Sequence, residues 1–288
     1  MKIISSLIGG AVLAATFATS AHATATLQAQ YLFDNNLNSN VAGAPDLIAT
    51  DPSSTSAFVT DTVYGDSRTV YQFNGTSTPS NQGGLTFNDS GALISANSYS
   101  LDLVFEFFGR NDAWRRIIDV QNRQSDNGFY VDPSNNLNIY PVSSGGNGFT
   151  TGVYHNVALT VNGTTVTGYL DNVASFSITT SLMDISNPDN PGALVNLFLD
   201  NVIAGGQGEW SAGNIALANF YDGVLSTDQL ATLISNPFSS VVPPATCGVA
   251  GTPPCTNSVP EPESFVLVGL GLAGLGFVRH HRKQQAAA

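Results

Sequence analysis

An alternation of apolar and other residues repeats along most of the chain and constrains its fold more than any other feature. In residues 100–108 (SLDLVFEFF), every second residue from Leu101 to Phe107 is apolar. Successive side chains of a β-strand point to opposite faces of a sheet, so this period of two predicts a strand. The same pattern occurs in residues 154–161 and 195–201.

Polar and glycine-rich segments separate these runs at short intervals. Asn162-Gly163 predicts a hairpin, because such a pair supplies the positive φ angles of a type I′ turn. One helix is expected after Ser226, which has Gln229 at the spacing of a capping box. Many short strands with polar turns predict an all-β, antiparallel β-sandwich over residues 24–238.

Residues 1–23 have the pattern of a secretory signal peptide. Lys2 gives the positive start, residues 3–18 give the apolar stretch, and a small-residue cleavage site ends at Ala23. We expect cleavage after Ala23 and export through the Sec machinery.

Residues 239–258 are rich in proline and are expected to form a spacer. This spacer contains Cys247 and Cys255. In an oxidising compartment, two cysteines at this spacing are expected to form a disulfide that closes a small loop.

Residues 259–288 have three parts in a fixed order. The apolar run at 265–278 makes a helix of about 21 Å, which is short for a membrane span. The basic end at 279–283 favours retention of that end in the cytoplasm. The motifs that flank the run are Val259, Pro260, Glu261 and Pro262 before it, and Arg279, Arg282 and Lys283 after it.

This order of Pro-Glu-Pro, short apolar helix and basic end resembles the PEP-CTERM sorting signal. Bacteria that export polysaccharide carry that signal on proteins that a membrane protease-transpeptidase, the exosortase, processes. The resemblance implies a transient inner-membrane intermediate, removal of the tail, and a mature protein at the cell surface or in the extracellular matrix.

Removal of both ends leaves few positive charges. Five arginines and no lysine remain, against a large excess of aspartate and glutamate. Phosphate binding depends on lysine and arginine, so nucleic acid is excluded as a partner. The acidic surface is compatible with cations and with neutral glycans.

Five short motifs follow one another between residues 27 and 235. They are Tyr31-Leu32-Phe33-Asp34, Phe73-Asn74-Gly75, His155-Asn156-Val157-Ala158, Tyr169-Leu170-Asp171 and the segment from Tyr221 to Leu233. In this order they resemble a laminin G-like, concanavalin A-like jelly-roll domain of the bacterial secreted type. The resemblance implies a jelly-roll fold and a lectin-like role in binding glycans.

The chain departs from this family pattern in three places. Tyr154 stands where the family usually has tryptophan, and Asn172 stands where it usually has glycine. Ala216 and Leu217 follow Ile215, where the family often has acidic residues. Part of a family calcium site is therefore expected to be missing.

Calcium is nevertheless the one candidate cofactor. Asp34, Asn36 and Asn38 carry oxygen side chains at alternate positions and are the best local candidates for ligands. The run lacks the glycine and the terminal glutamate of an EF-hand. The alternative is an Asn-rich turn that makes its own backbone hydrogen bonds.

We find no catalytic motif. A glycosidase needs two carboxylates that flank the scissile bond, and the Glu-x-Asp-x-x-Glu string of related glucanases is absent. Asp102 and Glu106 share a strand face but lie roughly 13 Å apart along it, farther than glycosidase carboxylates. We expect both to be solvated on an open sheet face. His155 shares the parity of the core residues and is expected to be buried and hydrogen-bonded. These observations predict that the chain is not an enzyme.

The best candidate for ligand recognition surrounds Trp114. The tryptophan offers an aromatic platform, and arginines near it offer planar donors for sugar hydroxyls. These arginines are Arg110, Arg115, Arg116 and Arg123. The alternative is that the arginines form internal salt bridges and that Trp114 lies in the core. Trp210, beside Glu209, is a second candidate.

Together these features predict a secreted, non-catalytic jelly-roll module that binds exopolysaccharide or another glycan. Two alternatives stay open. One is a polysaccharide hydrolase or lyase on the same fold, and the other is a structural surface protein without a ligand.

Overall fold

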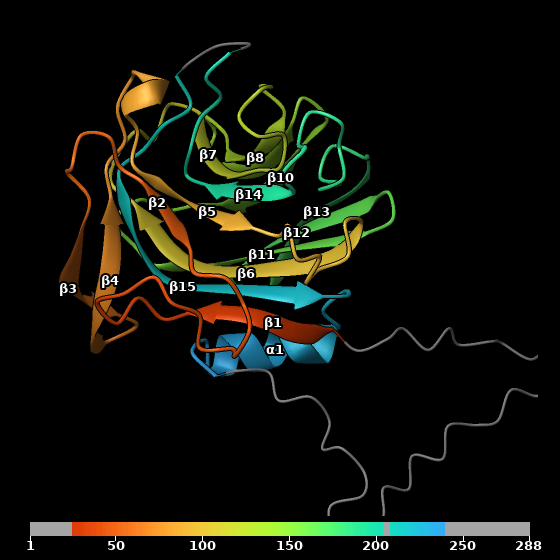
Figure 1. Cartoon of the computed structure of the whole chain (residues 1–288), viewed down its shortest axis with the longest axis horizontal. Helices are drawn as coiled ribbons and strands as arrows, with labels where there is room; N and C mark the ends of the chain where they lie inside the picture. Colours follow the sequence, from red (N-terminus) through yellow and green to blue (C-terminus); the bar gives the residue numbers. More distant parts are fainter. Residues whose placement is uncertain (1–24, 204–207, 240–288) are drawn as a thin grey trace, which may run out of the picture. The chain divides into compact units, whose positions relative to one another are not determined.

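The computed structural model describes residues 25–203 and 208–239 and shows an antiparallel β-sandwich of two sheets (Figure 1). The all-β fold predicted from the alternation is therefore confirmed. The predicted signal peptide, the predicted Cys247–Cys255 disulfide and the predicted sorting tail with its apolar run lie outside the described residues. Within the described ranges, no helix is both long and apolar enough to cross a membrane.

The larger sheet has eight strands. They are β1 (Thr26–Tyr31), β3 (Ala57–Val63), β4 (Asp66–Phe73), β6 (Ser98–Phe107), β11 (His155–Asn162), β12 (Thr165–Leu170), β13 (Val173–Thr179) and β15 (Gly213–Asp222). Their order across the sheet is β13-β12-β11-β6-β15-β4-β3, and β1 also pairs with β15. The two longest strands, β6 and β15, pair near the centre of the sheet.

The smaller sheet has seven strands. They are β2 (Ile48–Thr50), β5 (Gly84–Asn88), β7 (Arg115–Asp119), β8 (Gly128–Val131), β9 (Asn136–Tyr140), β10 (Ser143–Gly148) and β14 (Leu194–Leu197). Their order is β10-β9-β8-β7-β14-β5-β2. A single 3₁₀ turn, η1 (Pro79–Asn81), precedes β5.

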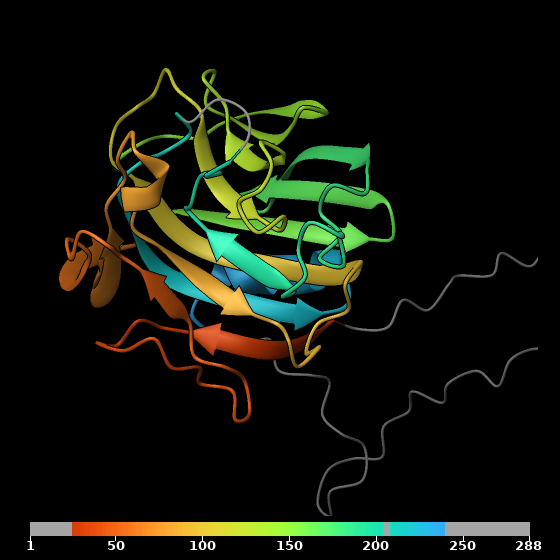
Figure 2. The same cartoon turned by 45° about the horizontal axis from the view of Figure 1, so that its top comes forward.

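The hydrophobic core lies between the two sheets, which stack face to face (Figure 2). Every second residue of β6 from Leu101 to Phe107 is fully buried there, as the alternation predicts. Phe73 of β4 and Phe198, which follows β14, stack with their ring centroids 4.0 Å apart. Because these rings come from different sheets, the pair ties the two layers together and contributes about 0.5–1.5 kcal/mol beyond its buried area.

The opposite face of the larger sheet is covered as well. The helix α1 (Thr227–Ser235) lies on the side of this sheet away from the smaller sheet (Figure 1). Leu230 and Leu233 of the helix pack with Ala158 of β11 and Tyr221 of β15. This sheet is therefore buried on both faces over much of its area.

The prediction that Asp102 and Glu106 are solvated was wrong. Asp102 has no exposed surface, and Glu106 is 6% exposed. The reason is that residues outside the sheet, including α1, cover the face on which both side chains lie. Asp102 accepts hydrogen bonds from the side chains of Asn156 and Asn219 in place of water.

Two local predictions can be compared with the structure, and one of them differs from it by one residue. The capping box of α1 is confirmed, because the Ser226 hydroxyl accepts from the backbone of Gln229 and the Gln229 side chain accepts from the backbone of Ser226. The predicted hairpin joins β11 and β12, but its turn begins one residue later than expected. Asn162 still belongs to β11 and pairs with Thr165, so only Gly163 takes a positive φ, of 60°.

Candidate functional site

Five side chains surround a cavity of about 260 Å³. They are Trp114, Asp126, Tyr130, Tyr140 and Glu209, and together they form the aromatic pocket. Tyr130 of β8 and Tyr140 of β9 alternate with core residues of their strands, so both point away from the core. Trp114 directly precedes β7, which pairs with β8. The pocket therefore lies on the outer face of the smaller sheet.

The rings of the aromatic pocket meet edge to face. The ring centroid of Trp114 lies 5.3 Å from that of Tyr140 and 5.6 Å from that of Tyr130. Tyr130 is 1% exposed, whereas Tyr140 is 36% exposed. The open side of the pocket is thus at Tyr140. Rings with an accessible apolar edge and polar neighbours suit ligands that have both apolar faces and hydroxyl groups.

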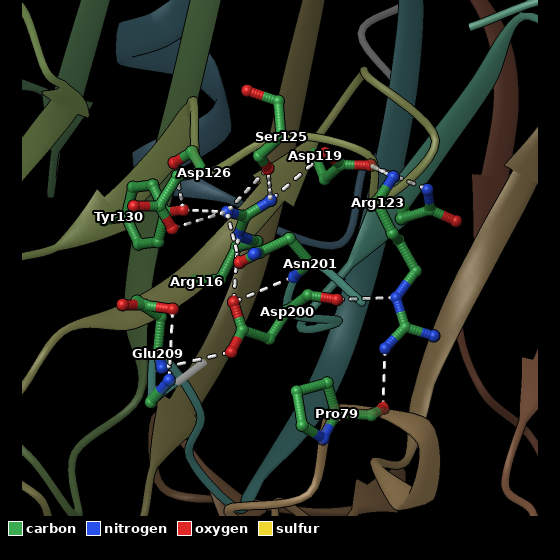
Figure 3. Close-up of polar contacts among 12 residues, drawn as sticks. Pro79, Arg116, Asp119, Arg123, Ser125, Asp126, Tyr130, Asp200, Asn201 and Glu209 are labelled. Atoms are coloured by element: carbon green, nitrogen blue, oxygen red, sulfur yellow. Dashed lines mark hydrogen bonds and ion pairs between the residues drawn. The ribbon is translucent and has the colours of Figure 1, made fainter. Parts of the chain in front are cut away.

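Arg116 is buried behind the pocket and contacts three carboxylates (Figure 3). Its Nη1 lies 3.1 Å from Asp119, its Nε 3.7 Å from Asp200, and its Nη2 3.9 Å from Asp126. Its Nη2 also donates a hydrogen bond to the hydroxyl of Tyr130. Arg116 therefore positions two members of the pocket wall, and the salt-bridge alternative is confirmed for this arginine.

Arg123 supports the same cluster from the other side (Figure 3). Its Nε donates to the backbone oxygen of Asp200 and its Nη2 to that of Pro79, both at 2.6 Å. Its backbone N–H donates to Oδ2 of Asp119 at 2.8 Å. Burial lowers the pKa of the Arg123 guanidinium. The side chain connects the cluster to η1 and does not line the pocket.

Glu209 forms an acidic wall of the aromatic pocket. Burial, followed by a hydrogen bond and charge repulsion with Asp200, raises the pKa of Glu209 to about 7. Its Oε2 accepts from the backbone N–H of Gly208 at 3.2 Å, and its own N–H donates to Asp200 at 3.2 Å. The pocket therefore contains a carboxyl group whose raised pKa means that it titrates near neutral pH.

Of the predicted recognition residues, Trp114 alone lines the pocket. Arg116 and Arg123 lie behind it, and Arg110, Arg115 and Trp210 lie elsewhere. Arg115 points into the core and has no exposed surface, with its guanidinium carbon 5.6 Å from the ring centroids of Phe107 and Phe149. Arg110 lies over the ring of Trp210, 4.2 Å from its centroid. Neither residue of that pair lines the cavity.

The sequence prediction found Trp114 but missed Tyr130 and Tyr140. Both tyrosines lie at strand positions that alternate with core residues, so their outward direction was readable from the pattern. Their convergence on Trp114 depends on the pairing of β7, β8 and β9, which the sequence pattern does not specify.

The predicted calcium ligands lie in an exposed turn after β1. The Asn36 amide nitrogen donates to the backbone oxygen of Asp34, and its oxygen accepts from the backbone N–H of Asn38, both at 2.9 Å. This geometry is that of the alternative, an Asn-rich turn that makes its own backbone hydrogen bonds, and calcium binding at these residues stays a prediction. In the part of the chain that the structure describes, no group of three or more His, Cys, Asp or Glu side chains is placed to hold a metal ion.

His155 is confirmed as a buried, hydrogen-bonded residue. It is 7% exposed, and its Nδ1 lies 2.7 Å from Oδ2 of Asp171. The backbone N–H of Thr150 donates to its Nε2 at 3.0 Å. Both ring nitrogens therefore have structural partners.

A second cleft, of about 320 Å³, includes Asp61 and Glu106 among its lining residues. The Asn214 amide donates to both carboxyl groups, at 2.7 Å to Asp61 and 3.2 Å to Glu106. Burial, and then a hydrogen bond and charge repulsion with Asp61, raises the pKa of Glu106 to about 7. Burial acts in the same direction on Asp61, but hydrogen bonds from the Thr62 backbone and the Tyr154 hydroxyl outweigh it and lower the pKa of Asp61. The two pKa values are shifted in opposite directions, so below pH 7 Glu106 is the protonated member of the pair and Asp61 is the ionised one.

The comparison with known families concerns the C-terminal end. Residues 258–283 match the PEP-CTERM protein-sorting motif, which confirms the resemblance of the tail. These residues lie outside the part that the structure describes. No curated protein matches the chain in sequence.

Solved structures resemble the sandwich. Domain 4 of AbnA, a GH43 extracellular arabinanase from Geobacillus stearothermophilus, solved in complex with arabinotriose, is 20% identical with a TM-score of 0.54, over 74% of this chain and 100% of that one. The binding domain of Paraclostridial Mosquitocidal Protein 1 is 13% identical with a TM-score of 0.51, over 74% of this chain and 53% of that one. At these identities the likeness shows the fold alone. The chain thus joins a jelly-roll β-sandwich to a PEP-CTERM sorting motif, and it is a secreted protein that an exosortase processes and that is directed to the cell surface.

Proposed function

We propose that this protein is a non-catalytic glycan-binding module of the cell surface or extracellular matrix, which it reaches through an inner-membrane intermediate. The observation that carries the proposal is the aromatic pocket, where three rings and two carboxyl groups meet at one open cavity. Sugars present apolar C–H faces to rings and hydroxyl groups to carboxylates. The cavity volume of about 260 Å³ lies just below the range of pockets that bind drug-sized ligands. A cavity of this size suits one sugar unit of a longer chain.

The comparisons support this proposal in two ways. Domain 4 of AbnA, which has a similar fold, was solved in complex with arabinotriose. The sorting motif indicates a protein that is directed to the cell surface. The resemblance of the tail to the PEP-CTERM signal implies a bacterium that exports polysaccharide.

The test is binding of the full chain and two variants to an array of polysaccharides. Trp114→Ala removes a ring of the pocket and is expected to weaken binding at least about tenfold, because central aromatic anchors contribute about 2 kcal/mol or more. Phe108→Ala is the matched control, since Phe108 is 41% exposed and does not line the pocket. Equal binding by the Trp114 variant and the wild type contradicts the proposal. Binding to no glycan leaves a structural surface protein as the better account.

One observation favours a second function, a polysaccharide-degrading enzyme. Asp126 and Glu209 both line the pocket, and the raised pKa of Glu209, about 7, is a property of general acids. Release of reducing sugar from bound glycans decides between the two functions. Turnover that Glu209→Gln abolishes would replace the binding proposal, whereas binding without turnover supports it.

A further inference from the structure

The charged groups of the aromatic pocket all have the same sign. Asp126 and Glu209 line the cavity, and the other lining residues are Trp114, Tyr130 and Tyr140. No lysine or arginine is therefore among the residues that line this cavity. A ligand in the pocket meets rings, hydroxyl groups and carboxyl groups.

The cations behind the pocket are already engaged. The Arg116 side chain has no exposed surface and contacts Asp119, Asp126 and Asp200. Arg123 donates to backbone oxygens and to no ligand-facing group. The cluster in Figure 3 therefore contains four carboxyl groups, including that of Glu209, for two guanidinium groups. Its excess charge is negative.

The remaining nearby arginines cannot reverse this charge at the cavity. Arg110 is held over Trp210 and donates to the backbone oxygen of Gly208. Arg115 points into the core between the sheets. An anionic ligand would lose its hydration in the pocket without gaining an ion pair, and it would face two carboxyl groups.

We propose that the aromatic pocket selects neutral sugars against uronic acids, and that Glu209 is the residue that determines this selection. The inference rests on the proposed glycan-binding function and names its ligand class. Specificity of this kind comes from repulsion of the wrong ligand as much as from attraction of the right one. Like charges at contact distance in a partly buried site are enough for a preference of at least about tenfold.

Protonation of Glu209 should weaken this preference. The groups that face its carboxyl are Asp200, Asp126 and the hydroxyl of Tyr130, with Arg116 behind them. Below pH 7 the carboxyl becomes neutral and can donate a hydrogen bond. A uronic acid stays ionised at pH 6, because its own pKa lies near that of an ordinary carboxyl group.

The experiment uses the full chain on an array where each uronic-acid polysaccharide stands beside its carboxyl-reduced form, at pH 8 with a chelator present. The expected result is tighter binding of the reduced form, by at least about tenfold. Equal or tighter binding of the acidic form overturns the inference and leaves the glycan-binding function intact. Binding to none of the neutral or acidic glycans overturns both.

Two further arms test the role of Glu209. Glu209→Gln should reduce the preference several-fold, whereas Asp112→Asn, which removes the same charge at an exposed position outside the pocket, should leave it unchanged. Equal effects of the two variants would assign the preference to overall charge and overturn the role of Glu209. If Glu209→Gln fails to fold, a shift of the wild type from pH 8 to pH 6 should reduce the preference in the same direction, and an unchanged preference overturns that role.

Discussion

The Nε atom of Arg116 lies 3.7 Å from Oδ1 of Asp200, and both side chains are fully buried. Arg116 also contacts Asp119 and Asp126, so one guanidinium group balances carboxylates from several segments. Breaking a buried ion pair by removing one partner is costly, because the remaining charge is left without compensation. The stability of the domain and the shape of the aromatic pocket therefore depend on the same residue.

Arg116→Met is expected to lower the free energy of unfolding by about 3–5 kcal/mol, since it leaves buried carboxylates unpaired. Unfolding in urea, followed by circular dichroism, measures the change. A loss below about 1 kcal/mol would show that the cluster does not depend on its arginine.

Arg115→Met is the matched control at the neighbouring position and should behave differently. The Nη2 of Arg115 donates to Oδ1 of Asn135, but its Nε and Nη1 have no hydrogen-bond partner among the described residues. Burial lowers the pKa of Arg115 to about 10, which means that burial disfavours the charged form of its guanidinium group. Replacement of such a group by an apolar side chain of similar volume is expected to change the free energy of unfolding by less than about 1 kcal/mol or to raise it. A loss as large as that of Arg116→Met would contradict this assignment.

Glu106 should make stability depend on pH. The unfolded chain loses this proton near the ordinary pKa of 4.5, whereas the folded protein holds it up to about 7. Between these values the folded state binds more protons, so the contribution of Glu106 to the free energy of unfolding falls as pH rises and is constant above pH 7. Glu106→Gln mimics the protonated side chain and should remove this fall, on the order of 2 kcal/mol.

Urea unfolding from pH 4 to pH 8 measures the effect of Glu106→Gln. Asp112→Asn, at an exposed carboxylate, serves as the control and should keep the wild-type pH dependence. If Glu106→Gln and the wild type have parallel profiles, Glu106 does not hold a proton at neutral pH.

The capping box should contribute measurably to the stability of α1. Ser226→Ala removes the acceptor of the Gln229 backbone N–H and is expected to cost about 1 kcal/mol. Gln229→Ala should cost more, because the Gln229 side chain also donates to the backbone oxygen of Ala25 and so connects the helix to the start of β1. Ser235→Ala, at the exposed end of the same helix, is the control. Equal losses for all three variants in thermal unfolding would argue against the cap.

The strands could be predicted from the sequence because one face of each must be buried. The alternation from Leu101 to Phe107 identified the core face of β6 correctly. The burial of Asp102 could not be predicted, because the residues that cover it include helix α1, which lies more than 100 residues further along the sequence. The alternation within a strand indicates which of its faces lies in the core. It does not indicate which segment of the chain covers the other face.

The candidate site shows the same division between local and non-local information. Trp114 could be identified because a tryptophan among arginines and aspartates is a local signal. Arg115 and Arg116 could not be assigned to opposite faces of the smaller sheet without the register of β7. Tyr140 reaches the pocket only through the pairing of β9 with β8.

The most direct test of the central claim, that a sugar binds against Trp114, is a fluorescence titration of variants that keep one tryptophan each. The chain contains two tryptophans, so Trp210→Phe leaves Trp114 as the reporter and Trp114→Phe leaves Trp210. With the neutral glycan that the full chain binds most tightly, the account predicts a saturable change in emission from Trp114 and none from Trp210. A saturable change from Trp210 alone, or unchanged emission from Trp114 while the glycan binds, would contradict it.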